Sequence, residues 1–151
     1  EDTVLVFFTD HYGKYMTNHE FLMELKGVDN RDFLCNTPFF IYHSETSAKM
    51  VETLSSTMDI VPTIANLFGL DVVYTYYTGV DIFSNDEHYV IFSGNNWYDG
   101  EIYYTPDYQG EMTEEIIQRN DEISWRMACS EYILKSDYFS YLAEKSDITG
   151  K

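Results

Sequence analysis

Two adjacent residues, Asp10 and His11, have side chains suited to binding a divalent cation. They follow residues 3–8, a near-continuous run of β-branched and aromatic residues that predicts a buried strand. A carboxylate oxygen and an imidazole nitrogen at the carboxyl end of such a strand can turn towards one metal ion, and ligand clefts of α/β proteins lie at that end. The same pair is also typical of a turn beside a hydrogen-bonded histidine, so the spacing alone leaves both interpretations open.

Other polar residues near this pair have weaker signals. His19 follows by one short loop and is a candidate for binding a substrate phosphate from the rim of the cleft, but it also fits the start of a helix. Lys14 and Tyr15 are placed to meet an anionic head group, and the alternative is an ordinary solvated loop. His43 follows another apolar run and is expected to be a solvated loop residue.

The elements that must position these residues alternate between strand and helix. Strands are predicted at residues 3–8, 37–42, 89–92, 97–98 and 101–104, and helices at residues 21–26, 59–68 and 111–135. Asp99 and Gly100 predict a tight hairpin turn, since both residue types tolerate a positive φ. This order predicts an α/β fold with a central mixed β-sheet flanked by helices, followed by a C-terminal hairpin and a long helix.

The apolar faces of the two longer helices follow from their periodicity. The face predicted for residues 59–68 comprises Ile60, Ile64, Leu67 and Phe68. The face predicted for residues 111–135 comprises Met112, Ile116, Ile123, Met127 and Leu134. Residues from 136 onward are expected to form a largely polar tail.

The charge of the chain excludes one class of partner. The 151 residues include 9 Lys and Arg against 26 Asp and Glu, a net charge of −17, so a nucleic acid would be repelled. The hydrophobic content of 44% is nevertheless sufficient for a folded core. No apolar run approaches the roughly 20 residues of a membrane-spanning helix. Cys35 and Cys129 are expected to be buried thiols, with a disulfide as the less favoured interpretation.

Several motifs in a fixed order resemble a known family. The segment TDHYG follows the first strand at residues 9–13, the segment TPFFIY occupies residues 37–42, and STMDIVPTIANLFG occupies residues 56–69. This order resembles the C-terminal part of the sulfatase-like catalytic domain of the alkaline phosphatase superfamily, in particular its lipoteichoic acid synthase and phosphoglycerol transferase branch. The resemblance extends to residues 79–84, 97–104 and 133–139 and so covers most of the chain.

The resemblance implies roles for individual residues. In that family an Asp-His pair after a central strand supplies two ligands of the catalytic divalent ion, which places the metal ligands here at Asp10 and His11. Manganese is the expected ion, with magnesium, calcium or zinc as alternatives. The family's other ligands, a glutamate and the threonine nucleophile, lie upstream in the domain. The 151 residues alone are therefore expected to show no turnover, with no catalytic nucleophile in this chain.

The resemblance also implies a division of the chain and a parent protein. All of residues 1–151 would be the C-terminal portion of the catalytic domain, with an α/β core carrying the metal motif at 1–70, strands and hairpin at 71–110, and helix and tail at 111–151. The parent is expected to be a multi-pass membrane protein with this segment outside the cytoplasm. It would act on an anionic phospholipid or polyol phosphate, with the N-terminal half of the same domain as partner.

Two alternative functions remain open. One is a sulfatase or a phosphonate or phosphodiester hydrolase of the same superfamily, in which the nucleophile is made from Cys or Ser upstream. The other is a non-catalytic remnant or partner-binding domain. A chain that opens on a buried strand resembles a piece of a larger α/β protein, and it is expected to be prone to self-association through that strand.

Overall fold

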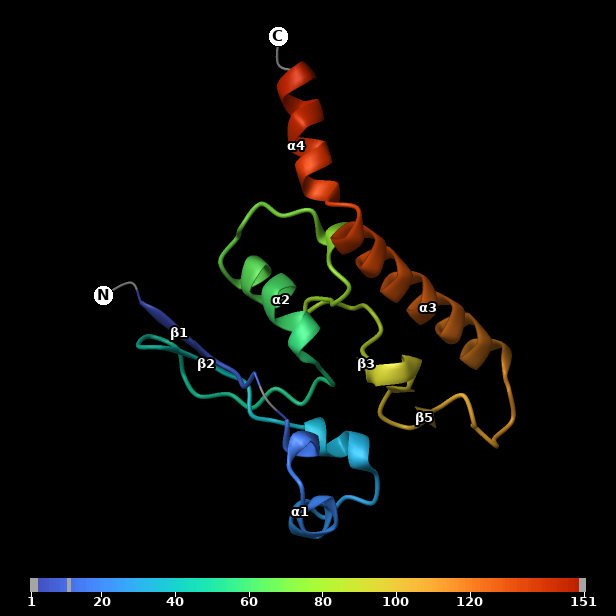
Figure 1. Ribbon diagram of the computed structural model, residues 1–151. Helices are drawn as coiled ribbons and strands as arrows, with labels where there is room; N and C mark the ends of the chain where they lie inside the picture. The colour runs from blue at the N-terminus through green and yellow to red at the C-terminus, as the bar shows by residue number, and fades with distance from the viewer. Residues whose placement is uncertain (1–2, 11, 150–151) are drawn as a thin grey trace. The chain divides into compact units, whose positions relative to one another are not determined.

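The computed structural model describes residues 3–10 and 12–149, apart from the side chains of residues 146–149, and has two compact units. Unit 1 is Glu1–Val51 and unit 2 is Glu52–Lys151. The first unit contains the strands β1 (Val4–Phe7) and β2 (Phe40–His43) and the helix α1 (His19–Lys26). The second contains the helices α2 (Ile60–Leu67), α3 (Glu114–Lys135) and α4 (Tyr138–Thr149) and the strands β3 (Val90–Ile91), β4 (Trp97–Tyr98) and β5 (Tyr103–Tyr104). Short 3-10 turns connect these elements (Figure 1).

In unit 1 the two predicted strands pair as an antiparallel ribbon. Leu5 lies opposite Tyr42 and Phe7 opposite Phe40, and the two phenyl rings stack with centroids 4.6 Å apart. The expected burial of the first strand on both faces is wrong, because Leu5 is 44% exposed and Phe7 43% exposed. Both strands are edge strands of a two-stranded ribbon, so neither is a central strand.

The helix α1 is positioned by its two caps. The Asn18 side chain accepts a hydrogen bond from the Phe21 amide at 3.2 Å, and Gly27 closes the helix with φ 65 in the left-handed region. The predicted helix is confirmed and begins two residues earlier, at His19, because Asn18 satisfies one of its first free amides. A 3-10 helix, Arg31–Cys35, then returns the chain to β2 and buries Leu34 completely.

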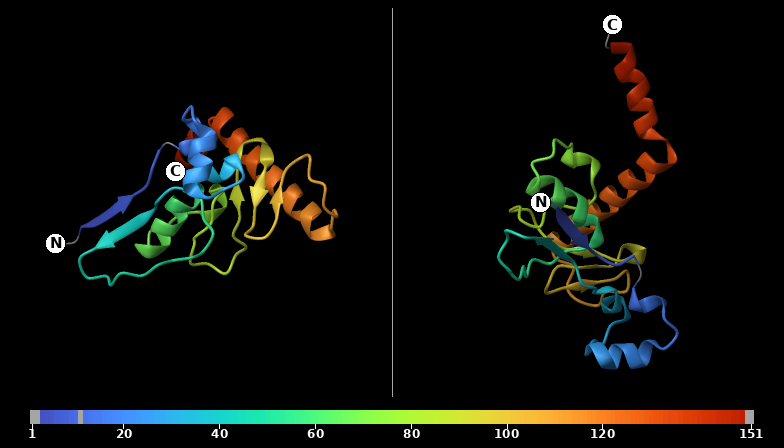
Figure 2. Two further views of the ribbon diagram at one scale, coloured as in Figure 1. Left: turned by 90° about the horizontal axis from the view of Figure 1, so that it is seen from below. Right: turned by 90° about the vertical axis from the view of Figure 1, so that its left-hand side faces the viewer.

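The core of unit 2 lies between a three-stranded antiparallel sheet and the first half of α3. The sheet has the order β3-β4-β5 (Figure 2), and its Trp97 is buried with Ile116 and Ile123 of α3. The Trp97 indole donates to the Asn120 side chain at 3.0 Å and stacks on Tyr104 at 5.2 Å. The side chain that fills most of this core thus has its only polar atom satisfied.

The hairpin predicted at Asp99 and Gly100 is confirmed. Gly100 has φ 103, which a side chain would strain, and the Asp99 carboxylate accepts from the amides of Glu101 and Ile102 at 3.0 and 2.7 Å. This turn sets the register in which Trp97 faces Tyr104 and Tyr98 faces Tyr103. The aromatic side chains of the hairpin therefore pack across strands, as the sequence indicated.

The 3-10 turn Thr57–Asp59, which leads directly into α2, begins at a capping box formed by Ser56 and Asp59. Asp59 accepts from the Ser56 amide at 2.6 Å and from the Val80 amide at 2.8 Å. The predicted apolar face is corrected: Leu67 and Phe68 are 46% and 44% exposed. The buried residues of this helix are Ile60, Pro62, Thr63 and Ala65. The helix is turned this way because Thr63 and Asp59 hold the segment around residues 80–82 by side-chain hydrogen bonds.

The predicted long helix is confirmed, and its predicted apolar face is correct only in part. Ile116 and Ile123 are buried, whereas Met112, Met127 and Leu134 are exposed. The sheet extends along only the first half of α3, so the later apolar positions have no sheet to pack against (Figure 1). The tail, expected to be polar apart from Tyr138, Phe139, Tyr141 and Leu142, forms α4, where Phe139 packs edge-on against Tyr76 at 5.3 Å.

The α/β class is confirmed, with helices and small sheets consistent with part of a sulfatase-like fold. The expected central mixed sheet is not what the described strands form, because they pair as two separate antiparallel sheets. Along the sequence, the boundary between the two compact units falls between residues 51 and 52. The expected division at residues 70 and 110 remains a prediction. None of the helices in the described part of the chain has the length and hydropathy to cross a membrane.

Candidate functional site

The loop after β1 carries the predicted metal ligands. Asp10 lies three residues beyond the end of the strand and its residue is exposed to solvent. His11, the second predicted ligand, lies outside the described residues. Asp10 also takes part in an interaction within the protein. The predicted position of Asp10 at the carboxyl end of a strand thus agrees with the structure, and ligation by either residue remains a prediction.

The described residues do not by themselves complete a metal site. A carboxylate and an imidazole are a suitable donor pair for manganese or zinc, which fits the residue types at positions 10 and 11. Among residues 3–10 and 12–149, however, there is no group of three or more His, Cys, Asp or Glu side chains that could hold an ion. A metal centre at this loop therefore requires ligands beyond the described residues.

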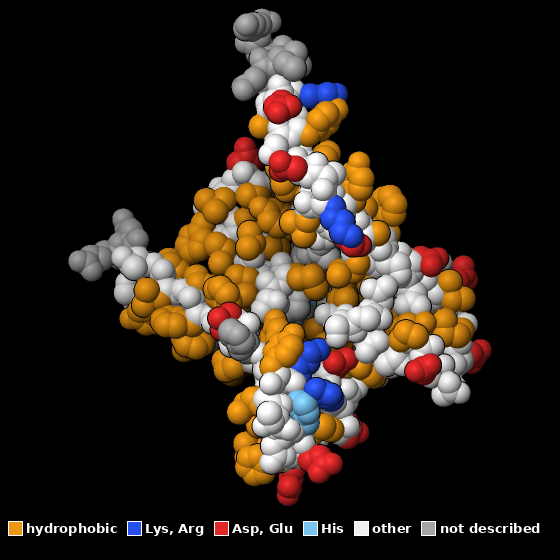
Figure 3. Space-filling model, in the orientation of Figure 1, with side chains coloured by type: hydrophobic (Ala, Val, Ile, Leu, Met, Phe, Trp, Pro, Cys, Tyr) orange, Lys and Arg blue, Asp and Glu red, His pale blue; other side chains and the backbone are white. Residues whose placement is uncertain are grey.

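His19, predicted to contact substrate, lies in a cluster with Lys14 and Arg31. The His19 imidazole donates from Nε2 to the carbonyl oxygen of Lys14 at 2.6 Å. Arg31 Nη2 lies 3.2 Å from the same Nε2 and 3.5 Å from the same carbonyl. Each of the three residues is the first or second residue of a short helix of unit 1, and those starts bring the basic side chains together. Figure 3 shows basic side chains beside a histidine on the surface around α1.

Beside this cluster lies a second, more enclosed group of polar residues. The Lys14 ammonium is 3.5 Å from Asp32, and both side chains are mostly buried. Burial raises the pKa of the neighbouring Cys35 thiol above its usual value, against the opposing effect of the Lys14 charge. At neutral pH Cys35 is therefore a protonated thiol, which is a poor nucleophile. Cys35 and Cys129 are both free and only partly buried, so the expected full burial is wrong.

The remaining histidines and Thr63 have structural partners. His43 is the half-buried last residue of β2, opposite Val4, so the predicted solvated loop position is wrong. Its Nδ1 accepts from the Glu45 amide at 3.4 Å. His88 Nε2 lies 3.4 Å from the Ser84 carbonyl, and its Nδ1 is buried without a partner in the described structure. The Thr63 hydroxyl accepts from the Ile82 amide at 3.1 Å in a fully buried position. Thr63 therefore supports the packing of α2 and is no nucleophile.

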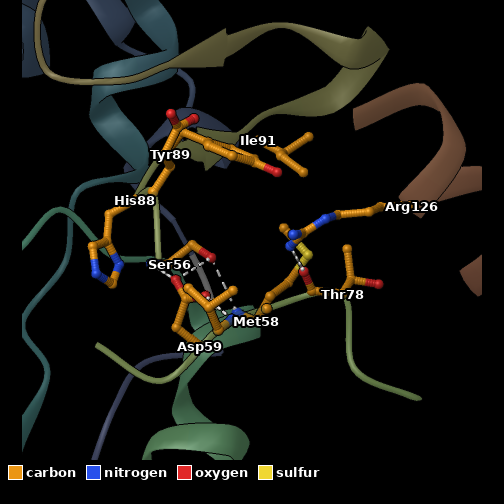
Figure 4. Close-up of a pocket in the computed structure, with 11 residues that line it drawn as sticks. Ser56, Met58, Asp59, Thr78, His88, Tyr89, Ile91 and Arg126 are labelled. Atoms are coloured by element: carbon orange, nitrogen blue, oxygen red, sulfur yellow. Dashed lines mark hydrogen bonds between the residues drawn. The ribbon is translucent and has the colours of Figure 1, made fainter. Parts of the chain in front are cut away.

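A shallow pocket in unit 2 is lined by residues of the Ser56–Asp59 turn and by residues from the sheet and α3 (Figure 4). The capping box occupies one side, where Asp59 accepts from Ser56. On the other side Arg126 reaches the Thr78 carbonyl at 3.2 Å and pairs with Glu122 at 2.7 Å. The charged groups of this pocket are engaged inside the protein, so it has the character of a packing defect rather than of a binding site.

A buried arginine holds unit 2 together. Arg119, on α3, is 9% exposed and pairs with the carboxylates of Asp99, Glu87 and Glu115. Its guanidinium also lies over the Trp97 ring at 5.3 Å. Asp99 is the hairpin residue, so this ion pair joins α3 to the turn that the sequence predicted. Sequence analysis missed Arg119 because nothing in its spacing links it to an acidic residue 20 positions earlier.

Comparisons with known proteins add to this geometry. The model of the sulfatase family matches residues 1–70. Residues 1–70 are therefore similar to the sulfatase family. Lipoteichoic acid synthase 2 of Bacillus subtilis (strain 168) is 27% identical over 96 residues, which is 60% of this chain. The matched part is 15% of the length of that protein. No solved structure matches the chain.

The segment that matches the sulfatase model includes every residue proposed to act in the site. The loop with Asp10, the His19 cluster and the capping box before α2 all lie within residues 1–70. The predicted resemblance to a sulfatase-like domain related to lipoteichoic acid synthase is thereby confirmed. Arg31 is the one member of the cluster that sequence analysis missed, because positions 14, 19 and 31 share no periodicity.

Proposed function

We propose that this chain is part of an extracytoplasmic, metal-dependent phosphoglycerol transferase related to lipoteichoic acid synthase. The observation that carries the proposal is the match of the sulfatase model to residues 1–70, in which Asp10 lies exposed just beyond β1. The similarity of the chain to Lipoteichoic acid synthase 2 supports the transferase branch. The substrate class is glycerol phosphate from an anionic phospholipid such as phosphatidylglycerol. The parent is a membrane protein that presents this segment at the outer face of the membrane.

Within this proposal Asp10 and His11 are two ligands of a divalent ion, manganese foremost. A bound ion of this kind lowers the pKa of a nucleophilic hydroxyl and neutralises charge on phosphoryl oxygens. The threonine nucleophile and the remaining ligand belong to the N-terminal half of the same catalytic domain, which is the partner of this chain. The 151 residues alone bind the ion weakly and catalyse no transfer, because the nucleophile is not among them.

Manganese binding to the full 151-residue chain tests the role of the loop. We expect weak binding, seen as paramagnetic broadening of resonances near residue 10, and its loss in Asp10→Asn and in His11→Gln. The matched control is Asp29→Asn, which removes one exposed carboxylate from the same unit. Equal binding by Asp10→Asn and by the unchanged chain would contradict ligation by this loop.

The choice of reaction is tested in the parent protein. We expect the open reading frame to continue upstream of Glu1 through a threonine nucleophile motif, a ligand glutamate and several apolar stretches. Because the matching family model is that of the sulfatases, a sulfatase or phosphonate hydrolase is the second candidate. A cysteine or serine in the nucleophile motif, of the kind converted to formylglycine, would select this second candidate. Translation starting near Glu1 would leave a non-catalytic domain.

A further inference from the structure

Arg31 is unusual among the arginines of this chain. In unit 2, Arg119 pairs with three carboxylates and Arg126 pairs with Glu122 at 2.7 Å. Arg31 pairs with no carboxylate among the described residues, although the chain has 26 acidic residues for 9 Lys and Arg. An exposed guanidinium in so acidic a chain would ordinarily meet a carboxylate. Its environment therefore differs in kind from that of the other two arginines.

The hydrogen bonds that Arg31 makes to the described residues are weak or geometrically unavailable. The His19 Nε2 atom carries one hydrogen, which it donates to the Lys14 carbonyl at 2.6 Å. The same atom then cannot accept from Arg31 Nη2, which lies 3.2 Å away. The contact of Arg31 with the Lys14 carbonyl is 3.5 Å long, at the limit of a hydrogen bond. The guanidinium carries five N–H donors, and the residues that the structure describes use at most one of its nitrogens.

The neighbouring Lys14, unlike Arg31, has a carboxylate partner. The Lys14 ammonium lies 3.5 Å from Asp32, and both side chains are mostly buried. The Lys14 charge is thus offset locally, while that of Arg31 is not. Arg31 is exposed and His19 is half-buried, so both are reachable from solvent. The fixed fork of a guanidinium matches the oxygens of a tetrahedral anion, which it can bind through two parallel hydrogen bonds.

We propose that Arg31 and His19 form a binding site for a phosphoryl or sulfuryl oxyanion, with Arg31 as the principal ligand and His19 as its neighbour. The site deepens the proposed function, on which it rests, by giving the phosphate group of the substrate a place in unit 1. The anion accepts hydrogen bonds from the N–H groups of Arg31 that have no acceptor among the described residues. His19, held by the Lys14 carbonyl through Nε2, keeps its ring against the guanidinium and fixes one side of the site.

Anion titration of the full 151-residue chain by NMR tests this proposal in the presence of EDTA and at constant ionic strength. The probes are glycerol 1-phosphate, glycerophosphoglycerol as a phosphodiester, and sulfate. We expect saturable shifts at the Arg31 Nε–H and at the His19 ring. Arg31→Gln should weaken the binding by roughly tenfold or more, and Arg31→Lys should restore it in part. Tighter binding of the diester would identify the head group of a phospholipid as the source of the anion, and tighter binding of sulfate a sulfate ester.

The matched control is Lys49→Gln, which removes one exposed positive charge from the same unit. It should leave the titration unchanged. Equal weakening by Arg31→Gln and Lys49→Gln would overturn the proposal, because it would show a general charge effect. Absence of a saturable shift in the unchanged chain would overturn it as well. Amide spectra of each variant verify that the fold is retained.

The anion titration is done in EDTA, without a metal ion, so its result is independent of the manganese-binding test of the proposed function. Binding that depends on Arg31, together with manganese binding that ignores Asp10, would retain the anion site and reject the metal-dependent reaction. Manganese binding that depends on Asp10, without any binding of the anions, would reject the site alone.

Discussion

Arg119 of unit 2 and Arg31 of unit 1 have opposite environments. Arg119 in unit 2 is 9% exposed, pairs with three carboxylates and lies over the Trp97 ring. Arg31 in unit 1 is exposed and pairs with no carboxylate among the described residues. A buried charge with its partners in place holds a fold together, whereas an exposed one with unused donors can bind a ligand. The arginine of unit 2 therefore stabilises the fold, and that of unit 1 has donors open to solvent.

The largest expected effect is a loss of stability on replacing Arg119 by methionine, compared with the same replacement at Arg31. Arg119→Met should lower the free energy of unfolding by about 3 kcal/mol, because it leaves the mostly buried Asp99 carboxylate without its cation. Glu87 and Glu115 contribute little to this loss, since their side chains are 71% and 75% exposed. Urea denaturation followed by tryptophan fluorescence measures the change, as both tryptophans lie in unit 2.

The same change at the other arginine is the control. Arg31→Met should change the free energy of unfolding, followed by circular dichroism, by less than about 0.5 kcal/mol. Equal losses from the two substitutions would remove the distinction between a structural and a ligand-binding arginine.

A smaller effect is expected from adding a methyl group to a glycine of each unit. At Gly79 a Cβ would lie 2.2 Å from the Met58 carbonyl oxygen, which is backbone and cannot swing away. Gly79→Ala should therefore cost about 2 kcal/mol of stability. At Gly13 the nearest atom is the Leu34 carbonyl oxygen at 3.3 Å, so Gly13→Ala should cost less than about 1 kcal/mol. Thermal unfolding of both variants checks the order, and the reverse order would contradict the tighter packing of unit 2.

The smallest expected effect concerns Tyr89, whose phenol donates to Glu122 at 3.3 Å. Burial raises the pKa of Tyr89 from 10.0 to about 12, and the Glu122 charge adds to the increase against Arg126 and Arg119. Between these pH values the folded chain keeps a proton that the unfolded chain loses. The contribution of Tyr89 is present in full below about pH 10 and is lost as the pH rises towards 12.

Ultraviolet titration of the phenolate band measures this shift as the difference between the unchanged chain and Tyr89→Phe. We expect the difference spectrum to appear near pH 12, and the pH dependence of stability to become shallower in the variant. A difference centred near pH 10 would show that the environment of Tyr89 is as open as the loops of unit 1.

The local elements were predictable because their signals are contained in a few neighbouring residues. Gly100 turns the hairpin with a positive φ, as the sequence predicted, and Gly27 ends α1 with a positive φ directly after the predicted last residue of that helix. The pairing of the strands was not predictable in the same way. Apolar runs of similar composition fit a buried central strand and an exposed ribbon equally, and only the arrangement of the whole chain decides between them.

The candidate site was predictable where the motif is contiguous and missed where it is dispersed. Asp10 and His11 are adjacent and follow an apolar run, so the pair stands out in the sequence. Arg31 meets His19 only because η2, the 3-10 helix that starts at Arg31, returns the chain to the start of α1. Such a contact depends on loop geometry, which residue types and periodicity do not encode.

The core of unit 2 is built from contacts within one continuous stretch of the chain. Asp99 and Arg119 are 20 residues apart, Trp97 and Asn120 are 23 apart, and Tyr89 and Glu122 are 33 apart. All of these contacts lie within residues 89–122, because α3 follows the hairpin directly along the chain. During synthesis the hairpin and the first half of α3 should therefore assemble as soon as both have left the ribosome, before α4 has emerged.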